Sequence, residues 1–469
     1  MNEVGGQRRG IHFGKCSSIR RAAVGAIYRR ARAPLGLYVL ALLASGCGTD
    51  KTALRSDAFG QGATARALSE QRDAGGDAAA GAACPPFTLP SYDQLPENPK
   101  FPDPFTTLAG NRLTKKAQWA CRQAEISAAL QEYELGPKPP RPAQVSGQLG
   151  PTAFTVTAGD GTTSISFDAT ITLPTTGTAP YPALIGIGNS SLDNALLASL
   201  GVALIRFPNG AVAAQVNGQS RGQGSFYTLH GSDHGAGAMM AWAWGVSRLI
   251  DALETTPGTQ IDPTRLGVTG CSRNGKGALV VGAFDERIKL TIPQESGSGG
   301  SASWRVSDFQ QQQWIAAGSP ADPVSEDVQT LHQIVQENVW FRASFSQFSY
   351  SANRLPFDHH LLMGLVAPRA LLVIENTSQF WLGKRSTFTN SAIAHRIYEA
   401  LGIPDSMAYS QIGDHAHCQF PASQIPLLTA YVQKFLIGGG TDNTNVIETD
   451  GGFVVDEARW VDWTTPALE

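Results

Sequence analysis

Apolar and polar residues alternate in different ways along this chain, and the differences predict its secondary structure. Residues 154–158 and 164–173 alternate apolar with polar side chains on either side of a Gly159-Asp160-Gly161 turn, which predicts an antiparallel hairpin. Continuous apolar runs, typical of strands buried on both faces, follow at residues 181–187, 202–207, 265–269, 288–292, 370–374 and 407–412. These runs predict the central strands of a sheet.

Segments of helical composition separate many of these runs. The predicted helices cover residues 114–133, 191–199, 235–253, 276–284 and 425–436. Strands that alternate with helices predict an α/β fold, a three-layer αβα sandwich around a mainly parallel sheet. The proline-rich residues 85–107 are expected to lie over the surface of this domain.

The first 83 residues differ in composition from the rest of the chain. Seven arginines precede a ten-residue apolar run at residues 35–44, which predicts that residues 1–47 are a signal peptide. Its end is similar to a bacterial lipobox and makes Cys47 a candidate lipidation site; ordinary secretion after cleavage nearby is the alternative. Residues 48–83 are rich in small and polar residues and predict a flexible linker, which leaves residues 84–469 as the folded domain.

Charge and cysteine content narrow the classes of function. The chain has 36 basic and 39 acidic residues, and a net charge of −3 is too balanced to predict a nucleic-acid partner. No cysteine or histidine cluster has the spacing of a zinc site, so we expect no bound metal. Outside the leader the chain has Cys84, Cys121, Cys271 and Cys418, and an even number of cysteines in an exported protein predicts disulfides.

A stretch from Gly267 to Gly300 carries the clearest chemical signal. Its first part reads as a strand, a sharp turn that contains Ser272, and a helix. A serine between glycines at such a turn resembles the nucleophile elbow of α/β-hydrolases, although the second glycine, Gly275, comes one residue later than in the usual motif. The helix N-terminus would stabilise an oxyanion formed there. The alternative is a serine that only forms the turn.

A serine nucleophile needs a histidine base, and two histidines compete for this role. His415 and His417 both follow the last predicted strand, where α/β-hydrolases place their base. Cys271 immediately precedes Ser272, and Cys418 immediately follows His417. A Cys271–Cys418 disulfide would tie nucleophile and base together, which favours His417 over His415. The alternative is that these cysteines are unpaired.

At these motifs the sequence resembles the glucuronoyl esterases, a carbohydrate esterase family of the α/β-hydrolase superfamily. The matching strings are GCSRNGKG at residues 270–277, PQESG at 293–297 and HCQFP at 417–421, and the resemblance extends from about Cys84 to Trp463. It implies an α/β-hydrolase fold and a serine esterase without metal or cofactor. The implied substrate is the ester between 4-O-methyl-glucuronic acid of glucuronoxylan and a lignin alcohol.

The resemblance also implies roles for individual residues of the catalytic machinery. Ser272 matches the nucleophile, His417 the general base and Glu295 the acid that orients the histidine. Other members use an acid after a later strand, and Glu375 is the candidate at that position, either as an alternative acid or as a structural carboxylate. Arg273 matches the residue that faces the oxyanion.

Four further residues match positions that contact the uronate sugar, namely Lys276, Gln329, Glu337 and Trp381. Lys276 follows Ser272 by four residues and can share its face at the helix mouth. The alternatives are purely structural roles: Gln329 and Glu337 could form the polar face of a helix, and Trp381 could be a core residue. The resemblance also implies an N-terminal disulfide between Cys84 and Cys121.

Two other segments carry predictions of their own. The sequence Asp358-His359-His360 looks like a catalytic pair, but we expect it to cap the following apolar helix within a structural hydrogen-bond network.

Residues 309–327 form an insert relative to the fungal pattern of the family. We expect this insert to lie as a loop near the pocket and to influence specificity for xylan branches or for the alcohol.

The sequence therefore predicts two-step acyl transfer by an exported esterase, a monomer that is either a periplasmic or outer-membrane lipoprotein or secreted. Two other functions stay open. The first is another carbohydrate serine esterase, such as an acetylxylan or feruloyl esterase, for which Lys276 and Trp381 have no obvious use. The second is a xylan-binding lipoprotein without activity, which would not need Ser272, His417 and Glu295 together.

Overall fold

The computed structural model describes residues 84–319 and 328–469. The predicted signal peptide at residues 1–47 with Cys47, the predicted linker at 48–83 and the second part of the insert, residues 320–327, lie outside the described residues.

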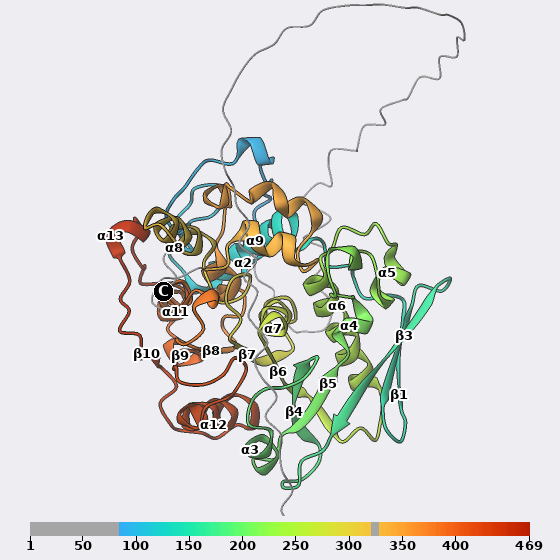
Figure 1. Ribbon diagram of the computed structural model, residues 1–469. Helices are drawn as coiled ribbons and strands as arrows, with labels where there is room; N and C mark the ends of the chain where they lie inside the picture. Colours follow the sequence, from blue (N-terminus) through green and yellow to red (C-terminus); the bar gives the residue numbers. More distant parts are fainter. Residues whose placement is uncertain (1–83, 320–327) are drawn as a thin grey trace, which may run out of the picture. The chain divides into compact units, whose positions relative to one another are not determined.

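A ten-stranded sheet forms the middle of the domain (Figure 1). Its strands in chain order are β1 (Gln144–Leu149), β2 (Phe154–Gly159), β3 (Ser164–Thr172), β4 (Tyr181–Ile187), β5 (Ala203–Phe207), β6 (Ile261–Cys271), β7 (Ile288–Gln294), β8 (Ala370–Glu375), β9 (Met407–Gln411) and β10 (Ile447–Thr449). Their order across the sheet is β1-β2-β3-β5-β4-β6-β7-β8-β9-β10. The first three strands and the β3–β5 pair are antiparallel, and all pairs from β5 to β10 are parallel. The prediction of a mainly parallel sheet is confirmed.

Helices cover both faces of this sheet. The α-helices of the described residues are α2 (Trp119–Leu130), α3 (Asn194–Ser199), α4 (Asn209–Val212), α5 (Ser225–His230), α6 (Ala238–Thr255), α7 (Arg273–Phe284), α8 (Trp304–Ala316), α9 (Leu331–Glu337), α10 (His359–Gly364), α11 (Lys384–Ala400), α12 (Ile425–Tyr431) and α13 (Glu457–Trp460). Successive residues of one strand point to opposite sides: Leu184 packs in a core with α3 and α12, whereas Ile185 packs in a larger core with α6, α7 and α11. This gives the predicted three-layer αβα sandwich.

The proline-rich segment at residues 85–107 lies over the surface, as the sequence predicted, with most of its residues exposed or half-buried, and it is anchored by a few buried side chains. Phe101 and Phe105 are fully buried, and the Phe101 ring packs edge-to-face on Trp460 near the other end of the described chain. The Phe101 N–H also donates to the Trp460 carbonyl at 3.0 Å. The sequence did not predict these two buried anchors, because aromatic residues among many prolines show no period.

The prediction that residues 309–327 form a loop was wrong for the first part. Residues 309–316 are the last two turns of α8, which Ser303 caps by accepting a hydrogen bond from the Val306 N–H. Phe309 packs edge-to-face on Trp460 and under the Arg459 guanidinium. This helix end is thus fixed to the C-terminal segment by aromatic packing.

Asp358 behaves as the sequence predicted. It caps α10 by accepting from the His359 N–H, and it accepts further bonds from Ser303, Trp304 and Arg305. His359 bridges the Gly300 carbonyl and Glu134. The cluster is buried and structural.

Among the described residues, no helix is long and apolar enough to cross a membrane.

Candidate active site

Ser272 lies on a strained turn between β6 and α7. Its φ of 59° is a left-handed conformation that non-glycine residues rarely adopt, and it places the serine as the N-cap of α7. Two glycines make the turn possible. A Cβ at Gly270 would lie 2.4 Å from the Asn274 carbonyl oxygen, and one at Gly275 would lie 2.7 Å from the Gln294 carbonyl oxygen. The late glycine of the motif is therefore explained: Gly275 lets α7 approach β7 closely.

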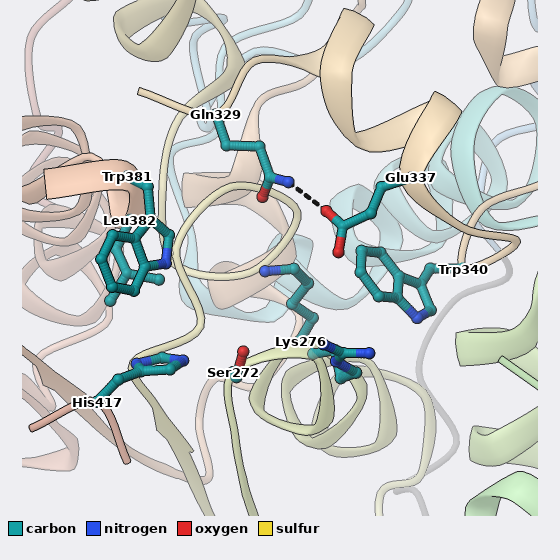
Figure 2. Close-up of a pocket in the computed structure, with 9 residues that line it drawn as sticks. Ser272, Lys276, Gln329, Glu337, Trp340, Trp381, Leu382 and His417 are labelled. Atoms are coloured by element: carbon teal, nitrogen blue, oxygen red, sulfur yellow. Dashed lines mark hydrogen bonds between the residues drawn. The ribbon is translucent and has the colours of Figure 1, made fainter. Parts of the chain in front are cut away.

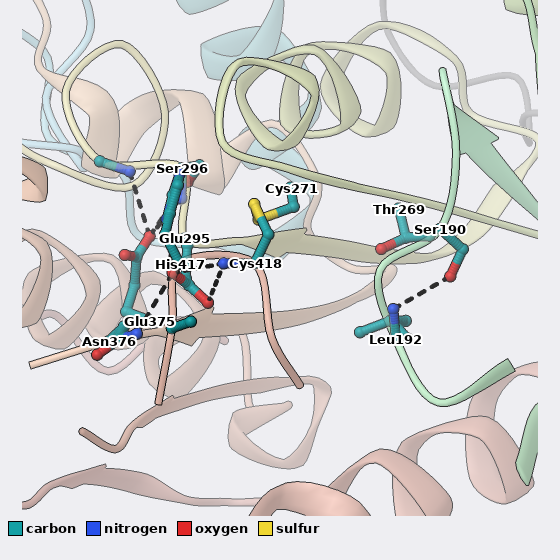
Figure 3. The surroundings of a disulfide bond; sticks show 12 residues. Ser190, Leu192, Thr269, Cys271, Glu295, Ser296, Glu375, Asn376, His417 and Cys418 are labelled. Atoms are coloured by element: carbon teal, nitrogen blue, oxygen red, sulfur yellow. Dashed lines mark hydrogen bonds and ion pairs between the residues drawn. A yellow bond between two sulfur atoms is a disulfide. The ribbon is translucent and has the colours of Figure 1, made fainter. Parts of the chain in front are cut away.

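Glu295 and His417 meet beside this turn (Figure 3). His417 Nδ1 lies 2.7 Å from Glu295 Oε2, and the Cys418 N–H donates to both Glu295 oxygens at 3.1 Å. The Glu295 side chain is fully buried, whereas that of His417 is 27% exposed. A proton on Nδ1 leaves Nε2 of His417 to accept one from a nucleophile.

A disulfide joins the loop that carries Ser272 to the loop that carries His417. Cys271 and Cys418 are bonded, with their Cα atoms 5.8 Å apart and 147 residues apart in sequence. Cys84 and Cys121 form the second disulfide. Ser272, Glu295 and Cys418 all have positive φ angles, so backbone strain gathers at this one place. Strain of this kind persists where the surrounding structure holds a functional geometry.

Glu375 has its hydrogen-bond partners away from the histidine. Its Oε1 accepts hydrogen bonds from the N–H groups of Ser296 and Gly297 and from the hydroxyl groups of Ser296 and Ser301. Burial, with a smaller contribution from the nearby Glu295 charge, raises the pKa of Glu375 to about 7. Geometry thus favours Glu295 as the acid and makes Glu375 a support for the loop that follows Glu295.

His415 is turned into the protein rather than toward the serine. Its Nε2 donates to the Ile412 carbonyl at 2.8 Å, and its Nδ1 lies 3.1 Å from the Asn376 side-chain amide. Asn376 also donates to Glu295 Oε2 at 3.4 Å. Asn376 is a supporting residue that the sequence analysis missed, although its place directly after β8 and Glu375 was a usable signal.

One cavity of about 210 Å³ contains most of the predicted site residues (Figure 2). The predicted residues that line it are Ser272, Arg273, Lys276, Gln329, Glu337, Trp381 and His417. Trp340 and Leu382 complete the lining and were not predicted. Glu295 lies behind His417, and Glu375 lies behind the loop of Glu295. Five separate segments of the chain therefore converge on one hollow.

Lys276 is a buried cation at the floor of this cavity. Its Nζ donates to the Ser296 carbonyl and lies 5.8 Å from the centre of the Trp340 ring. Burial lowers the pKa of Lys276 to about 8, against the opposing influence of Glu337. An ammonium has three donors, so Lys276 is suited to bind ligand hydroxyl oxygens in addition to the Ser296 carbonyl.

Gln329 and Glu337 lie opposite the serine in Figure 2 and are joined by a hydrogen bond from the Gln329 amide to a Glu337 oxygen. Gln329 precedes α9, so the two do not form the polar face of one helix. Trp340 lies beside them, and its indole N–H donates to Gln215 at 2.8 Å. The Arg273 guanidinium lies 5.6 Å from the centre of the Trp340 ring. Trp340 thus positions both cations of the site.

Ser272 and His417 line the same cavity but share no hydrogen bond in the described part of the chain. Contacts of this kind are often long in the free enzyme and tighten with substrate. The sulfur atoms of Cys271 and Cys418 lie near the His417 ring, but the disulfide prevents them from acting as thiolate metal ligands. The arrangement has the parts of a Ser–His–Glu acyl-transfer site.

Comparison with known proteins decides the family. The family model described as glucuronyl esterase, fungi, matches residues 156–402. A 4-O-methyl-glucuronoyl methylesterase of Hypocrea jecorina is 50% identical over 390 residues, which are 83% of this chain and 80% of that protein. The chain belongs to the glucuronoyl esterase family. The glucuronoyl esterases are carboxylic ester hydrolases, and this protein is one too.

Solved structures of glucuronoyl esterases agree with the fold. The catalytic domain of the Hypocrea jecorina enzyme is similar with a TM-score of 0.75 and 50% identity, covering 81% of this chain and all (100%) of that one. A serine-to-alanine mutant from Sporotrichum thermophile, in complex with methyl 4-O-methyl-β-D-glucopyranuronate, has a TM-score of 0.73 and 46% identity and covers 80% and 98%. The α/β-hydrolase fold expected from the sequence is confirmed.

Proposed function

We propose that this glucuronoyl esterase hydrolyses the ester between 4-O-methyl-glucuronic acid on glucuronoxylan and a lignin alcohol. The observation that carries the proposal is the single cavity that holds Ser272 and His417 at one side and the polar group of Lys276, Gln329 and Glu337 at the other. Such an arrangement suits a hydroxylated sugar whose carboxyl ester reaches the serine. The ester bound to the Sporotrichum thermophile mutant has the same acyl part.

The first half of the reaction acylates the serine. Nε2 of His417 takes the Ser272 proton as Oγ attacks the C6 ester carbonyl of the glucuronate, while Glu295 stabilises the imidazolium through Nδ1. The oxyanion of the tetrahedral intermediate is stabilised by N–H groups in the first turn of α7, which have no partner within the helix, and by the Arg273 side chain. The intermediate then breaks its bond to the alcohol oxygen, which leaves with the proton from His417.

The second half repeats these steps with water. His417 removes a proton from a water molecule, which attacks the acyl carbon, and the imidazolium returns that proton to Ser272 Oγ as the glucuronic acid leaves. The net reaction is ester plus water to acid plus alcohol. Every group that this scheme needs lies in or directly behind the cavity, and the scheme uses no metal or cofactor.

Substrate comparison distinguishes this function from its nearest rival. An acetylxylan or feruloyl esterase would act on acetylated xylan or on feruloyl esters, whose acyl groups are not sugars and would leave Lys276, Gln329 and Glu337 without a use. We expect the purified protein to hydrolyse the benzyl ester of glucuronic acid and to leave acetylated xylan and methyl ferulate essentially untouched. Faster release of acetate or ferulate than of glucuronic acid would contradict the proposal and favour an acetylxylan or feruloyl esterase. Binding of xylan without any turnover would favour a xylan-binding protein without activity.

The proposed site of action is outside the cytoplasm. Two disulfides, Cys84–Cys121 and Cys271–Cys418, support export, because such bonds persist in an oxidising environment. We further propose a lipid anchor at Cys47 and a monomeric enzyme. Globomycin treatment, which blocks lipoprotein signal cleavage, should cause the uncleaved precursor to accumulate, and Cys47→Ala should shift the protein out of the membrane fraction. Unchanged fractionation and processing would point to simple secretion.

A further inference from the structure

A second hollow, of about 570 Å³, lies outside the catalytic cavity and is open to solvent. The residues that line it are two tyrosines, one histidine, two glutamines and three serines, and none of them is an aspartate, glutamate, lysine or arginine. Hydroxyl and amide side chains both donate and accept hydrogen bonds. The lining of this second hollow therefore suits a neutral ligand that is rich in hydroxyl groups.

Tyr350 places an exposed aromatic ring at the second hollow. Tyr350 is 83% exposed, although its ring packs against His332 with centroids 4.4 Å apart and planes inclined by 31°. The Tyr350 hydroxyl also lies 3.0 Å from His332 Nε2, so a hydrogen bond holds the ring in addition to packing. A tyrosine ring offers a large, amphipathic contact area at low cost in conformational entropy. The apolar C–H face of a sugar ring can stack on such a ring.

The backbone orients the hydroxyl groups around this ring. Ser346 Oγ donates to the Ala343 carbonyl at 3.0 Å, and Ser349 Oγ donates to the Ser346 carbonyl at 2.7 Å. A hydroxyl that donates to the backbone keeps its oxygen as an acceptor. Gln347 is exposed and its side chain has no hydrogen-bond partner among the described residues, so it can donate as well as accept. The second hollow thus offers both donors and acceptors to the hydroxyl groups of a sugar.

The helix α9 lines both the second hollow and the catalytic cavity. His332 and Gln336 are four residues apart and share the face of α9 that lines the second hollow, whereas Glu337 lines the catalytic cavity. An α-helix with its side chains is only about 10–12 Å across. A polysaccharide chain with a uronate in the catalytic cavity can therefore reach the second hollow with a neighbouring part of its main chain.

We propose that the second hollow binds a neutral stretch of the xylan main chain, with one sugar ring stacked on Tyr350. This inference rests on the proposed function, because that function supplies the polysaccharide as the occupant. Binding at the second hollow keeps the chain close to the catalytic cavity and so favours long substrates over small esters. Tyr350 determines this preference and does not contact the reacting atoms.

The test measures how linear xylohexaose, which carries no uronate, binds to the full-length protein in isothermal titration calorimetry. We expect saturable binding to the wild type and an affinity about three- to tenfold lower in Tyr350→Ala, as for the loss of one aromatic contact. Tyr350→Phe keeps the ring and should retain more of the affinity than Tyr350→Ala. The ratio of kcat/KM on methyl-esterified glucuronoxylan to kcat/KM on methyl glucuronate should fall in Tyr350→Ala by a similar factor.

Val454→Ala is the control, because it truncates an apolar side chain that is 82% exposed and lines neither hollow. Its affinity for xylohexaose and its kcat/KM ratio should equal those of the wild type. No binding to the wild type, or an equal affinity in Tyr350→Ala, would overturn the second site while leaving the esterase function intact. Failure of the wild-type protein to hydrolyse either ester would instead overturn the proposed function and this inference with it.

Discussion

At the scale of single residues, two buried carboxylates near one histidine have different tasks because their neighbours differ. Glu295 faces His417 and the Cys418 N–H, whereas Glu375 faces the backbone of the Ser296–Gly297 turn. Sequence position alone left both open as the triad acid, since both lie at the end of a parallel strand. Only the hydrogen bonds separate them.

This difference predicts the behaviour of two matched variants. Glu295→Gln keeps the size of the side chain but removes the charge that stabilises the His417 imidazolium, and we expect kcat to fall by about three to four orders of magnitude. Glu375→Gln keeps the Oε1 acceptor for the turn, and we expect kcat to fall less than about tenfold. Steady-state kinetics on a glucuronate benzyl ester, with circular dichroism to check folding, measure both. Equal losses would assign the orienting role to the pair rather than to Glu295.

Lys276 carries a prediction about pH. Because burial lowers the pKa of Lys276 to about 8, the side chain is cationic below that pH and loses its charge as the pH rises through it. A neutral amine binds sugar hydroxyls more weakly than an ammonium, so KM should increase between about pH 7 and pH 9. In Lys276→Gln, KM should be about tenfold or more higher at pH 7, from the loss of a charged hydrogen bond, and should no longer change with pH in this range. A KM that rises equally in both proteins would assign the titration to another group.

At the scale of elements, the site depends on loops that leave the ends of parallel strands and are tied together covalently. Ser272 follows β6, Glu295 follows β7, and His417 lies on the loop after β9. The Cys271–Cys418 disulfide connects the first of these loops to the last across 147 residues. It therefore restricts the unfolded chain and fixes the histidine loop at the same time.

Removal of each disulfide separates these two effects. Cys271→Ala with Cys418→Ala should lower the free energy of unfolding by about 2–5 kcal/mol and lower kcat as well, because the His417 loop loses its tie. Cys84→Ala with Cys121→Ala should destabilise the protein with little effect on kcat, since that bridge lies outside the cavity. Denaturant unfolding and activity at a temperature where both variants are folded give the comparison. Full activity without the Cys271–Cys418 bond would show that packing alone holds the loop.

The elements also show what the sequence could and could not predict. The central strands were predictable because strands buried on both faces must be apolar throughout. The edge strand β1 was missed because its residues are mostly exposed. The helix α11 was missed for the opposite reason: it buries polar residues such as Thr387, Asn390 and Ser391, which obscures its period. Asn390 donates to the Ser301 carbonyl, and only the fold reveals that partner.

At the scale of the whole molecule, the described residues from Cys84 onward contain both disulfides, the sheet with its two cores and all proposed catalytic residues. Most residues of the site, which line the cavity or lie directly behind it, were predictable from motifs and family resemblance, and their catalytic and sugar-binding roles stay predictions. Trp340 was not predictable, because nothing in its local sequence shows that it packs against Lys276 and Arg273 from elsewhere in the chain.

We therefore expect residues 84–469 to act as an independent catalytic domain. A protein that begins just before Cys84 should fold and should hydrolyse glucuronate esters with kcat/KM within about twofold of the full-length chain, because the described residues of the site all lie after that point. Thermal unfolding and kinetics on the benzyl ester check this. Loss of folding or activity in the shorter protein would show that the preceding residues contribute to the domain.

The role of Ser272 as the residue that carries the acyl group underlies the whole mechanism. Its decisive test is the rate at which Ser272→Ala hydrolyses a glucuronate benzyl ester. We expect kcat to fall by about four orders of magnitude or more, as for other serine triads, at an unchanged melting temperature. A properly folded Ser272→Ala protein that keeps more than about a tenth of the wild-type kcat would show that another group carries the reaction.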